Sequence, residues 1–164
     1  MNIFKVKHWK DIKLLIFIVI AIESLGLISG FLGMVDKNLY TKLIKPAFSP
    51  PGWVFPVVWT ILYLLMAVAL YKIIIKGKQG EDISKALVYF FIQLALNFLW
   101  TIIFFRFRLY GVAFLELLLL LIFILLTTFE FYKIDKVAAY LMIPYIIWVS
   151  FAGILNYSIW ILNR

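Results

Sequence analysis

The chain has 164 residues, of which 66% are hydrophobic and 15% are charged. Soluble domains are typically about 45–50% apolar, so this composition favours a membrane protein. The absence of cysteine excludes disulfides and thiolate chemistry, and one histidine, His8, provides no metal cluster. The formal net charge is +8, but Lys and Arg concentrate in short loops and tails, as membrane proteins place them, which argues against a nucleic-acid partner.

Five apolar segments are long enough to cross a bilayer, because about 20 apolar residues in a helix span roughly 30 Å of hydrocarbon. Their continuously apolar character excludes the alternating pattern of a membrane β-barrel. Most connections between them are short and therefore join antiparallel neighbours. We expect an all-α membrane protein, a compact bundle of five transmembrane helices forming a single domain over residues 1–164. The expected helices are residues 12–35, 56–75, 86–105, 109–129 and 137–163.

The first helix carries an unusual polar and small-residue face. Glu23, Gly26, Gly30 and Gly33 follow at i, i+3, i+7 and i+10, so they share one side. The segment "GLISG" within this face matches G-x-x-x-G, a pattern that permits close backbone approach between helices. The face is explained either by packing within the chain or by the seam of a homodimer.

The first connection, residues 36–55, is the only one with room for structure of its own. Apolar residues from Leu39 to Ile44 alternate with lysines in a way that suits a short helix on the membrane surface. The stretch "KPAFSPPGWVFPVVW" (45–59) then contains four of the five prolines and two of the six tryptophans. So rigid a connection favours a lid over a pocket.

Polar groups converge in the half of the bundle below this lid. With a rise of 1.5 Å per residue, the depths of the polar side chains on helices three to five can be counted from the helix ends, and most lie roughly 8–12 Å from the lid side. Pro144 should kink the fifth helix before Trp148. The residues in this layer are Gln93, Asn97 and Trp100 on helix three, Glu116 on helix four, and Trp148, Ala152 and Asn156 on helix five.

Aromatic walls with a few amides suit a large, flat, mostly apolar ligand. Ala152, small between larger neighbours on its helix face, would leave space for it. The same residue types also fit purely structural roles: tryptophan belts occur at any membrane interface, and Asn97 and Asn156 can hydrogen-bond between helices. Intramembrane carboxyl groups such as Glu23 and Glu116 are functional candidates, although Glu116 can also be neutral and paired with an amide.

Several segments in order resemble the translocator protein family, also called tryptophan-rich sensory proteins. They are "KPAFSPPGWVF" followed by "PVVWTILYLLMAVAL" (45–70), "QLALNFLWTIIFF" (93–105), "FLELLLL" (114–120) and "YIIWVSFAGILNYSIWILN" (145–163). The resemblance implies a five-helix membrane protein, often a homodimer, that binds porphyrins such as protoporphyrin IX and haem in a pocket under the first loop. Benzodiazepine-type drugs bind in the same family. By motif position the implied ligand contacts are Trp53, Trp59, Asn97, Trp100, Trp148, Ala152 and Asn156.

Two departures from the family pattern affect the expected site. Gly111 is followed by Val112 where animal members have tryptophan, so that wall is less aromatic unless Phe114 compensates. The sterol-recognition pattern fails at the C-terminus, because six residues separate Tyr157 from Arg164. Sterol handling is therefore not expected.

Three functions compete. The first is sensing or regulation through tetrapyrrole binding, with no required cofactor and no metal. The second, described for some bacterial members, is light-dependent degradation of protoporphyrin IX, in which Trp59 and Trp148 are the candidate redox-active rings. The third is transport of tetrapyrroles or sterols, which ranks last because five spans show no inverted repeat. No nucleophile–base pair or phosphate loop indicates ordinary catalysis.

The expected location is the bilayer of a bacterial plasma membrane. Ten Lys and Arg residues lie on the N-terminal side and six on the side of the first loop. This small excess favours a cytoplasmic N-terminus.

Overall fold

The computed structural model describes residues 9–34, 36 and 38–164. Within this part of the chain, five helical spans are long and apolar enough to cross a membrane. This confirms an all-α, five-helix membrane protein. The expected end of the first helix at residue 35 lies outside the described residues. The elements are α1 (Trp9–Gly33), α2 (Leu39–Lys42), α3 (Val54–Lys78), α4 (Ser84–Thr101), the π-helical turn η1 (Ile102–Arg106), α5 (Tyr110–Ile134), α6 (Lys136–Leu141) and α7 (Ile143–Leu162).

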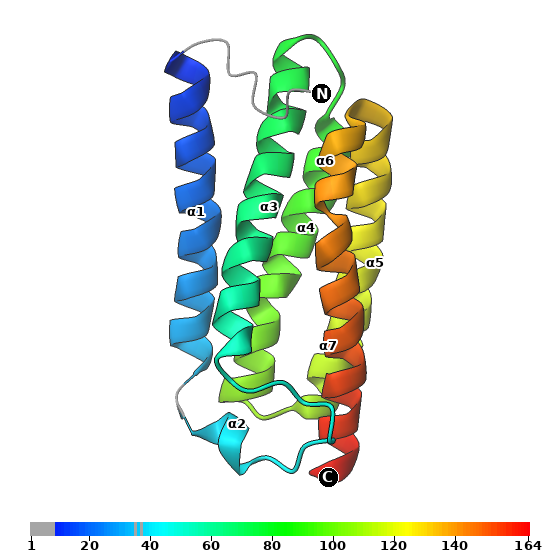
Figure 1. Cartoon of the computed structure of the whole chain (residues 1–164). Helices are drawn as coiled ribbons and strands as arrows, with labels where there is room; N and C mark the ends of the chain where they lie inside the picture. Colours follow the sequence, from blue (N-terminus) through cyan, green and yellow to red (C-terminus); the bar gives the residue numbers. More distant parts are fainter. Residues whose placement is uncertain (1–8, 35, 37) are drawn as a thin grey trace.

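The long helices run up and down in one bundle (Figure 1). α1 packs along α3, α4 along α5, and α5 along α7. The segment between α1 and α3, which we call loop one, is described at residue 36 and over residues 38–53. It lies at the same end of the bundle as the turn between η1 and α5 and the C-terminus (Figure 1). Within loop one the expected surface helix forms a single turn, α2, and the prolines follow it.

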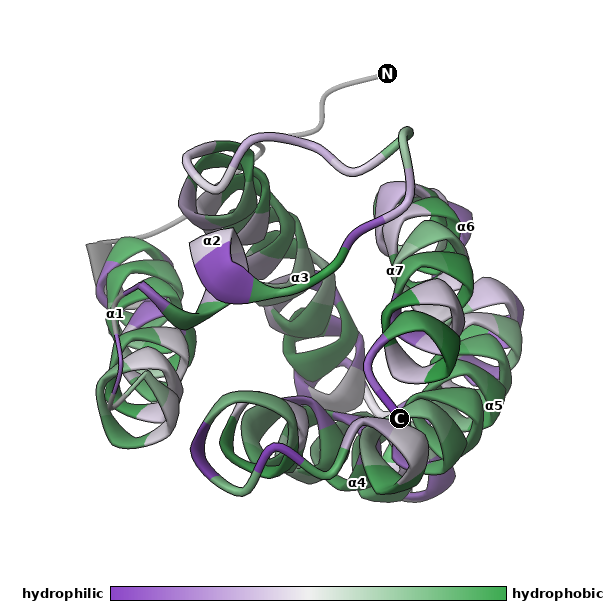
Figure 2. Cartoon of the chain, turned by 90° about the horizontal axis from the view of Figure 1, so that it is seen from below, coloured by the Kyte–Doolittle hydropathy of each residue, from purple (hydrophilic) through white to green (hydrophobic). Residues whose placement is uncertain are grey.

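The outside of the bundle is apolar, as lipid contact requires. Figure 2 shows hydrophobic residues around all the long helices, whereas loop one contains polar positions. On α1, Leu27 is 75% and Phe31 is 85% exposed, and no other part of the described chain covers them. The core is closed by large side chains such as Phe90, Met66 and Tyr145, all fully buried.

The fifth span is interrupted at Met142, between α6 and α7. Pro144 stands in the first turn of α7, where its missing N–H leaves no hydrogen bond unmade. The break therefore lies before the proline, several residues ahead of Trp148. The π-helical turn η1 at the end of α4 has no signature that hydrophobic periodicity reveals.

The glycines on α1 have different surroundings. A Cβ at Gly26 would overlap the ring of Tyr63 on α3, and one at Gly33 would lie 2.8 Å from the backbone oxygen of Thr101. A Cβ at Gly30 would meet nothing within 4 Å. Gly26 and Gly33 thus serve packing within the chain, whereas Gly30 faces open space.

Candidate ligand-binding site

Two cavities lie side by side at the loop-one end of the bundle, and both are lined by Trp100 and Ala152. The smaller has a volume of about 10 Å³ and the larger about 20 Å³. The smaller is also lined by Trp59, Asn97, Leu117, Leu120 and Val149. The larger is also lined by Tyr40, Phe55, Phe104, Phe105, Leu155, Asn156 and Ile159.

The structure shows these cavities in a closed form. Each has room for about one water molecule, whereas pockets for drug-sized ligands measure roughly 300–1,000 Å³. A flat ligand would therefore have to move a wall. Loop one supplies Tyr40 to the larger cavity and is the wall with the fewest helical hydrogen bonds.

Asn97 joins three helices below the smaller cavity. Tyr63 Oη on α3 donates to Asn97 Oδ1 at 2.7 Å, and Asn97 Nδ2 donates to Tyr145 Oη on α7 at 2.8 Å. Tyr145 in turn donates to Gln93 Oε1 at 3.0 Å. All four residues are buried. The interhelical role considered for Asn97 is real, and the same residue also borders the cavity.

A second polar contact connects α4, α7 and the start of α5. Trp100 Nε1 donates to Asn156 Oδ1 at 3.0 Å, and Asn156 Nδ2 donates to the carbonyl oxygen of Tyr110 at 2.8 Å. Asn156 is 1% exposed. Both ends of its amide are therefore hydrogen-bonded, and the bond to Nε1 orients the Trp100 ring, which lines both cavities.

The two tryptophans considered as redox-active have different positions. Trp59 lines the smaller cavity and packs against Tyr63 and Tyr145, with ring centroids 5.5 and 6.1 Å away. Trp148 lines neither cavity, but it packs against Phe55 and Phe151 at centroid distances of 5.9 and 5.5 Å. Its Nε1 is buried and has no hydrogen-bond partner among the described residues.

Two expected wall residues lie elsewhere. Trp53 is 70% exposed and borders neither cavity, because it stands just before the first residue of α3 at the surface. Phe114 does not replace the tryptophan that animal members have after the glycine of α5. It packs against Tyr157 and Trp160 on α7, at centroid distances of 5.2 and 6.2 Å.

The intramembrane polar residues are divided among different roles. Gln93 belongs to the Asn97 network. Glu23 is partly exposed on α1 and lines neither cavity. Both carboxyl oxygens of Glu116 are buried, and no described residue forms a hydrogen bond with them. The considered pairing of Glu116 with an amide is therefore absent.

Sequence reasoning missed the walls that come from loop one, the first turn of α3 and η1. Tyr40, Phe55, Phe104 and Phe105 are aromatic residues of the larger cavity that were not singled out. The pair Phe104–Phe105 lies inside the quoted segment "QLALNFLWTIIFF", but aromatic residues near a membrane interface are common and give no specific signal.

Loop one is held in place by contacts to α7 and by contacts within the loop. The amide of Asn163 after α7 bonds to both backbone groups of Ile44, at 3.0 and 2.8 Å. Within the loop, Tyr40 Oη donates to the carbonyl oxygen of Pro50 at 2.9 Å. The Phe48 ring packs edge-on against Phe151 of α7 at 6.3 Å between centroids.

Comparisons with known proteins agree with this architecture. The model of the TspO/MBR family matches residues 17–161, from the first span to the fifth. The chain belongs to the TspO/MBR family.

The chain is 43% identical over 124 residues to the tryptophan-rich protein TspO of Chlorobaculum tepidum, covering 76% of this chain and 78% of that protein. TspO of Archaeoglobus fulgidus is 35% identical over 146 residues, with 88% and 94% covered. The human translocator protein is 38% identical over 142 residues, with 84% and 83% covered. This TspO/MBR family member is thus an integral membrane protein with relatives in bacteria, archaea and animals.

Proposed function

We propose that this protein binds porphyrins such as protoporphyrin IX and haem, and related flat hydrophobic molecules, beneath loop one, and that binding serves sensing or regulation of tetrapyrroles. One observation carries the proposal. Two adjacent cavities share Trp100 and Ala152 and have aromatic rings on several sides, and Tyr40 of loop one forms part of the wall of the larger one. Aromatic rings stack on the faces of flat ligands, and amides orient their polar edges.

Opening of loop one would join the two cavities into one pocket. Displacement of Tyr40, together with a rotation of the Trp100 ring, would connect the space beside Trp59 with the space beside Phe104. The unpartnered Nε1 of Trp148 would then be available to donate a hydrogen bond to a ligand acceptor. The prolines of loop one limit the number of open conformations, which lowers the entropic cost of ordering the loop over a ligand.

Titration with protoporphyrin IX in the dark tests this proposal. Purified protein in nanodiscs should shift the Soret band and quench tryptophan fluorescence saturably, with one ligand per chain. Replacement of Trp59 by Leu should weaken binding by about three- to tenfold through loss of a stacking ring. Replacement of the exposed Trp53 by Leu is the matched control and should change the affinity less than twofold. A linear, non-saturable signal equal to that of empty nanodiscs would refute the proposal.

A second candidate function is light-driven oxidation of the bound pigment by dioxygen through an indole. The excited pigment takes one electron from the indole and passes it to dioxygen, which becomes superoxide; the indole radical cation then takes one electron back from the pigment, so that the pigment loses one electron and dioxygen gains it. The contact of Trp59 with the smaller cavity and with two tyrosine rings favours it as that donor. Phe at position 59 keeps most of the stacking area but lacks the easily oxidised indole. The Trp59→Phe variant should then lose bound pigment more slowly under light than both the wild type and Trp148→Phe. Equal rates in all three would mean that the indoles act only as walls.

We also propose that the protein lies in a bacterial plasma membrane with its N-terminus in the cytoplasm. The charge bias of the loops supports this orientation. The chain has no cysteine, so single cysteines introduced at the exposed positions Ala47 and Gln79 report the two sides separately. A membrane-impermeant maleimide added to intact cells should label position 47 and not position 79. The reverse pattern would invert the topology.

A further inference from the structure

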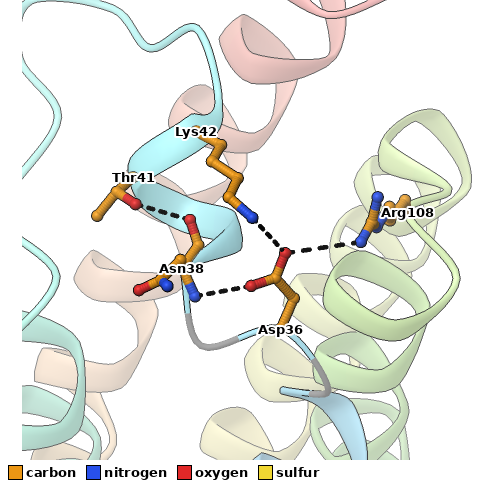
Figure 3. A network of polar contacts seen from close by, with 5 residues as sticks. All are labelled: Asp36, Asn38, Thr41, Lys42 and Arg108. Atoms are coloured by element: carbon orange, nitrogen blue, oxygen red, sulfur yellow. Dashed lines mark hydrogen bonds and ion pairs between the residues drawn. The ribbon is translucent and has the colours of Figure 1, made fainter.

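The loop-one end of the bundle is strongly basic. Residues 36–55, 106–109 and 164 contain six Lys and Arg residues and one acidic residue, Asp36. The single carboxylate is held between two cations: Lys42 Nζ lies 3.0 Å and Arg108 Nη2 lies 3.8 Å from Asp36 Oδ2 (Figure 3). All three side chains are accessible to solvent, with Lys42 65%, Arg108 57% and Asp36 28% exposed.

The two cations belong to the segments that form walls of the larger cavity. Lys42 ends α2, the turn that supplies Tyr40 to the cavity. Arg108 follows η1, which supplies Phe104 and Phe105. Each cation is thus within three residues in sequence of a side chain that lines the larger cavity, at the loop-one end of the bundle. Lys45 adds a third positive charge beside the cavity-lining Tyr40, with its Nζ 4.8 Å from the centroid of the Tyr40 ring.

The backbone at Arg108 ends η1 in the left-handed conformation common after helices, and the N–H of Leu109 donates to the carbonyl oxygen of Ile103 across this turn. Arg108 has a φ of 55°, and it is the one described non-glycine residue with positive φ. This left-handed conformation is uncommon for a long side chain and costs of order 1 kcal/mol or more. The conformation brings the guanidinium group to loop one, across the turn between η1 and α5 (Figure 3).

Asp36 has the properties of an internal ligand for this cationic pair. The hydrogen bond from Lys42 is the largest cause that lowers the pKa of the Asp36 carboxyl below its usual range, and the charge of Arg108 acts in the same direction. Asp36 is bound at an exposed site, where such pairs are weak. A carboxylate of a bound molecule could therefore replace it at small cost, because guanidinium and ammonium groups bind any carboxylate in this geometry.

We propose that Lys42 and Arg108 form a carboxylate subsite at the rim of the pocket, so that the preferred ligands are amphiphilic acids with a flat apolar body and carboxylates at one edge. Asp36 occupies the subsite in the closed form and is displaced when ligand binds. The apolar body lies between the aromatic walls, and the acid groups remain in water beside the cations. This inference rests on the proposed function.

The test compares protoporphyrin IX, a dicarboxylic acid, with its dimethyl ester, which has the same ring and no charge. Nanodiscs of zwitterionic phosphatidylcholine avoid competition from anionic lipid. The Lys42→Gln/Arg108→Gln variant should bind the diacid about three- to tenfold more weakly and the diester with unchanged affinity. The matched control removes two exposed cations from the opposite end, Lys85→Gln/Lys136→Gln, and should change neither affinity.

The substitution Asp36→Asn gives the sharper result. Asparagine keeps the side-chain oxygen that accepts the hydrogen bond from Asn38 N–H at the start of α2. It is uncharged, however, so it no longer forms ion pairs with Lys42 and Arg108. Affinity for the diacid should rise about two- to fivefold, and affinity for the diester should stay the same. If Asp36→Asn lowers the affinity for both ligands, the contacts of Asp36 are only structural and the proposed subsite is wrong. The proposal is also wrong if the affinities for the diacid and the diester change by the same factor in every variant. Failure of both ligands to bind the wild type would instead refute the proposed function itself.

Discussion

Asn163 and Ile44 form a two-bond connection between the end of α7 and loop one. Asn163 Nδ2 donates to the Ile44 carbonyl oxygen at 2.8 Å, and Asn163 Oδ1 accepts from the Ile44 N–H at 3.0 Å. The two residues are 119 positions apart in sequence. One side-chain amide therefore satisfies both backbone groups of a loop-one residue and holds the loop against the bundle.

Replacement of Asn163 by Ala should release loop one without unfolding the helices. Two solvent-accessible hydrogen bonds together contribute about 1–3 kcal/mol to local closure. Amide hydrogen exchange over residues 39–53 should become faster by at least severalfold, while exchange in α3 and α5 stays unchanged. Bound protoporphyrin IX should also dissociate faster. Unchanged exchange in loop one would mean that other contacts hold it.

Two glycines on the same helix should respond oppositely to alanine. At Gly26 a Cβ would overlap the Tyr63 ring, so Gly26→Ala should destabilise the protein by about 1–3 kcal/mol through overpacking. At Gly30 the Cβ meets open space, so Gly30→Ala should be neutral or stabilising by up to about 1 kcal/mol through helix propensity. Thermal unfolding in detergent measures both. If Gly30→Ala instead dissociates a dimer on size-exclusion chromatography, Gly30 lies in the homodimer seam that its sequence context also allows.

The buried network around Asn97 should be costly to break at its centre. Asn97→Ala leaves the Tyr63 hydroxyl without an acceptor and removes a donor to Tyr145, so the free energy of unfolding should fall by about 2–4 kcal/mol. Tyr63→Phe removes one hydroxyl and preserves the ring, and should cost about 1 kcal/mol. A double-mutant cycle should give a coupling of about 0.5 kcal/mol or more between the two sites. Strict additivity would contradict the hydrogen bond between them.

The Asp36 carboxyl should titrate below its usual range. Because its pKa is lowered in the folded protein, its ion pairs stabilise loop one above the ordinary aspartate pKa. That stabilisation is lost as the pH falls through the folded-state pKa. Carbonyl NMR of selectively labelled aspartate should show this low pKa, and Lys42→Gln should move it back towards the ordinary value. If the pKa of Asp36 is the same in Lys42→Gln as in the wild type, the hydrogen bond between Lys42 and Asp36 drawn in Figure 3 is excluded.

The fold was predictable from composition because apolar runs of sufficient length have few alternatives in a bilayer. The break of the fifth span near Pro144 also had a local cause in the sequence. The π-helical turn η1 had none, since it depends on how the end of α4 meets α1 and α5. The left-handed backbone of Arg108 follows the end of η1, where that conformation is common, but glycine or asparagine usually occupies the position, so an arginine there is no signal in the sequence.

The site was partly predictable because depth along a helix can be counted from its ends. Counting placed Asn97, Trp100 and Ala152 in one layer, and all three line the cavities. Counting does not give the direction of a side chain in a loop, and Trp53, which its motif position implies as a ligand contact, is exposed and borders neither cavity. Contacts that cross the whole chain, such as Asn163 with Ile44, have no signal in a single sequence.

The most direct measurement of the central claim is the dark affinity for protoporphyrin IX of two variants that add the same ring. Ala152 lines both cavities, whereas Ala139, also buried on the fifth span, borders neither. Phenylalanine at either position should cost about 1–3 kcal/mol of stability by overpacking. If the pocket lies beneath loop one, Ala152→Phe should weaken binding by at least tenfold in the folded fraction and Ala139→Phe by less than twofold. Equal affinities in both variants, with Ala152→Phe stably folded, would contradict a ligand pocket at this place.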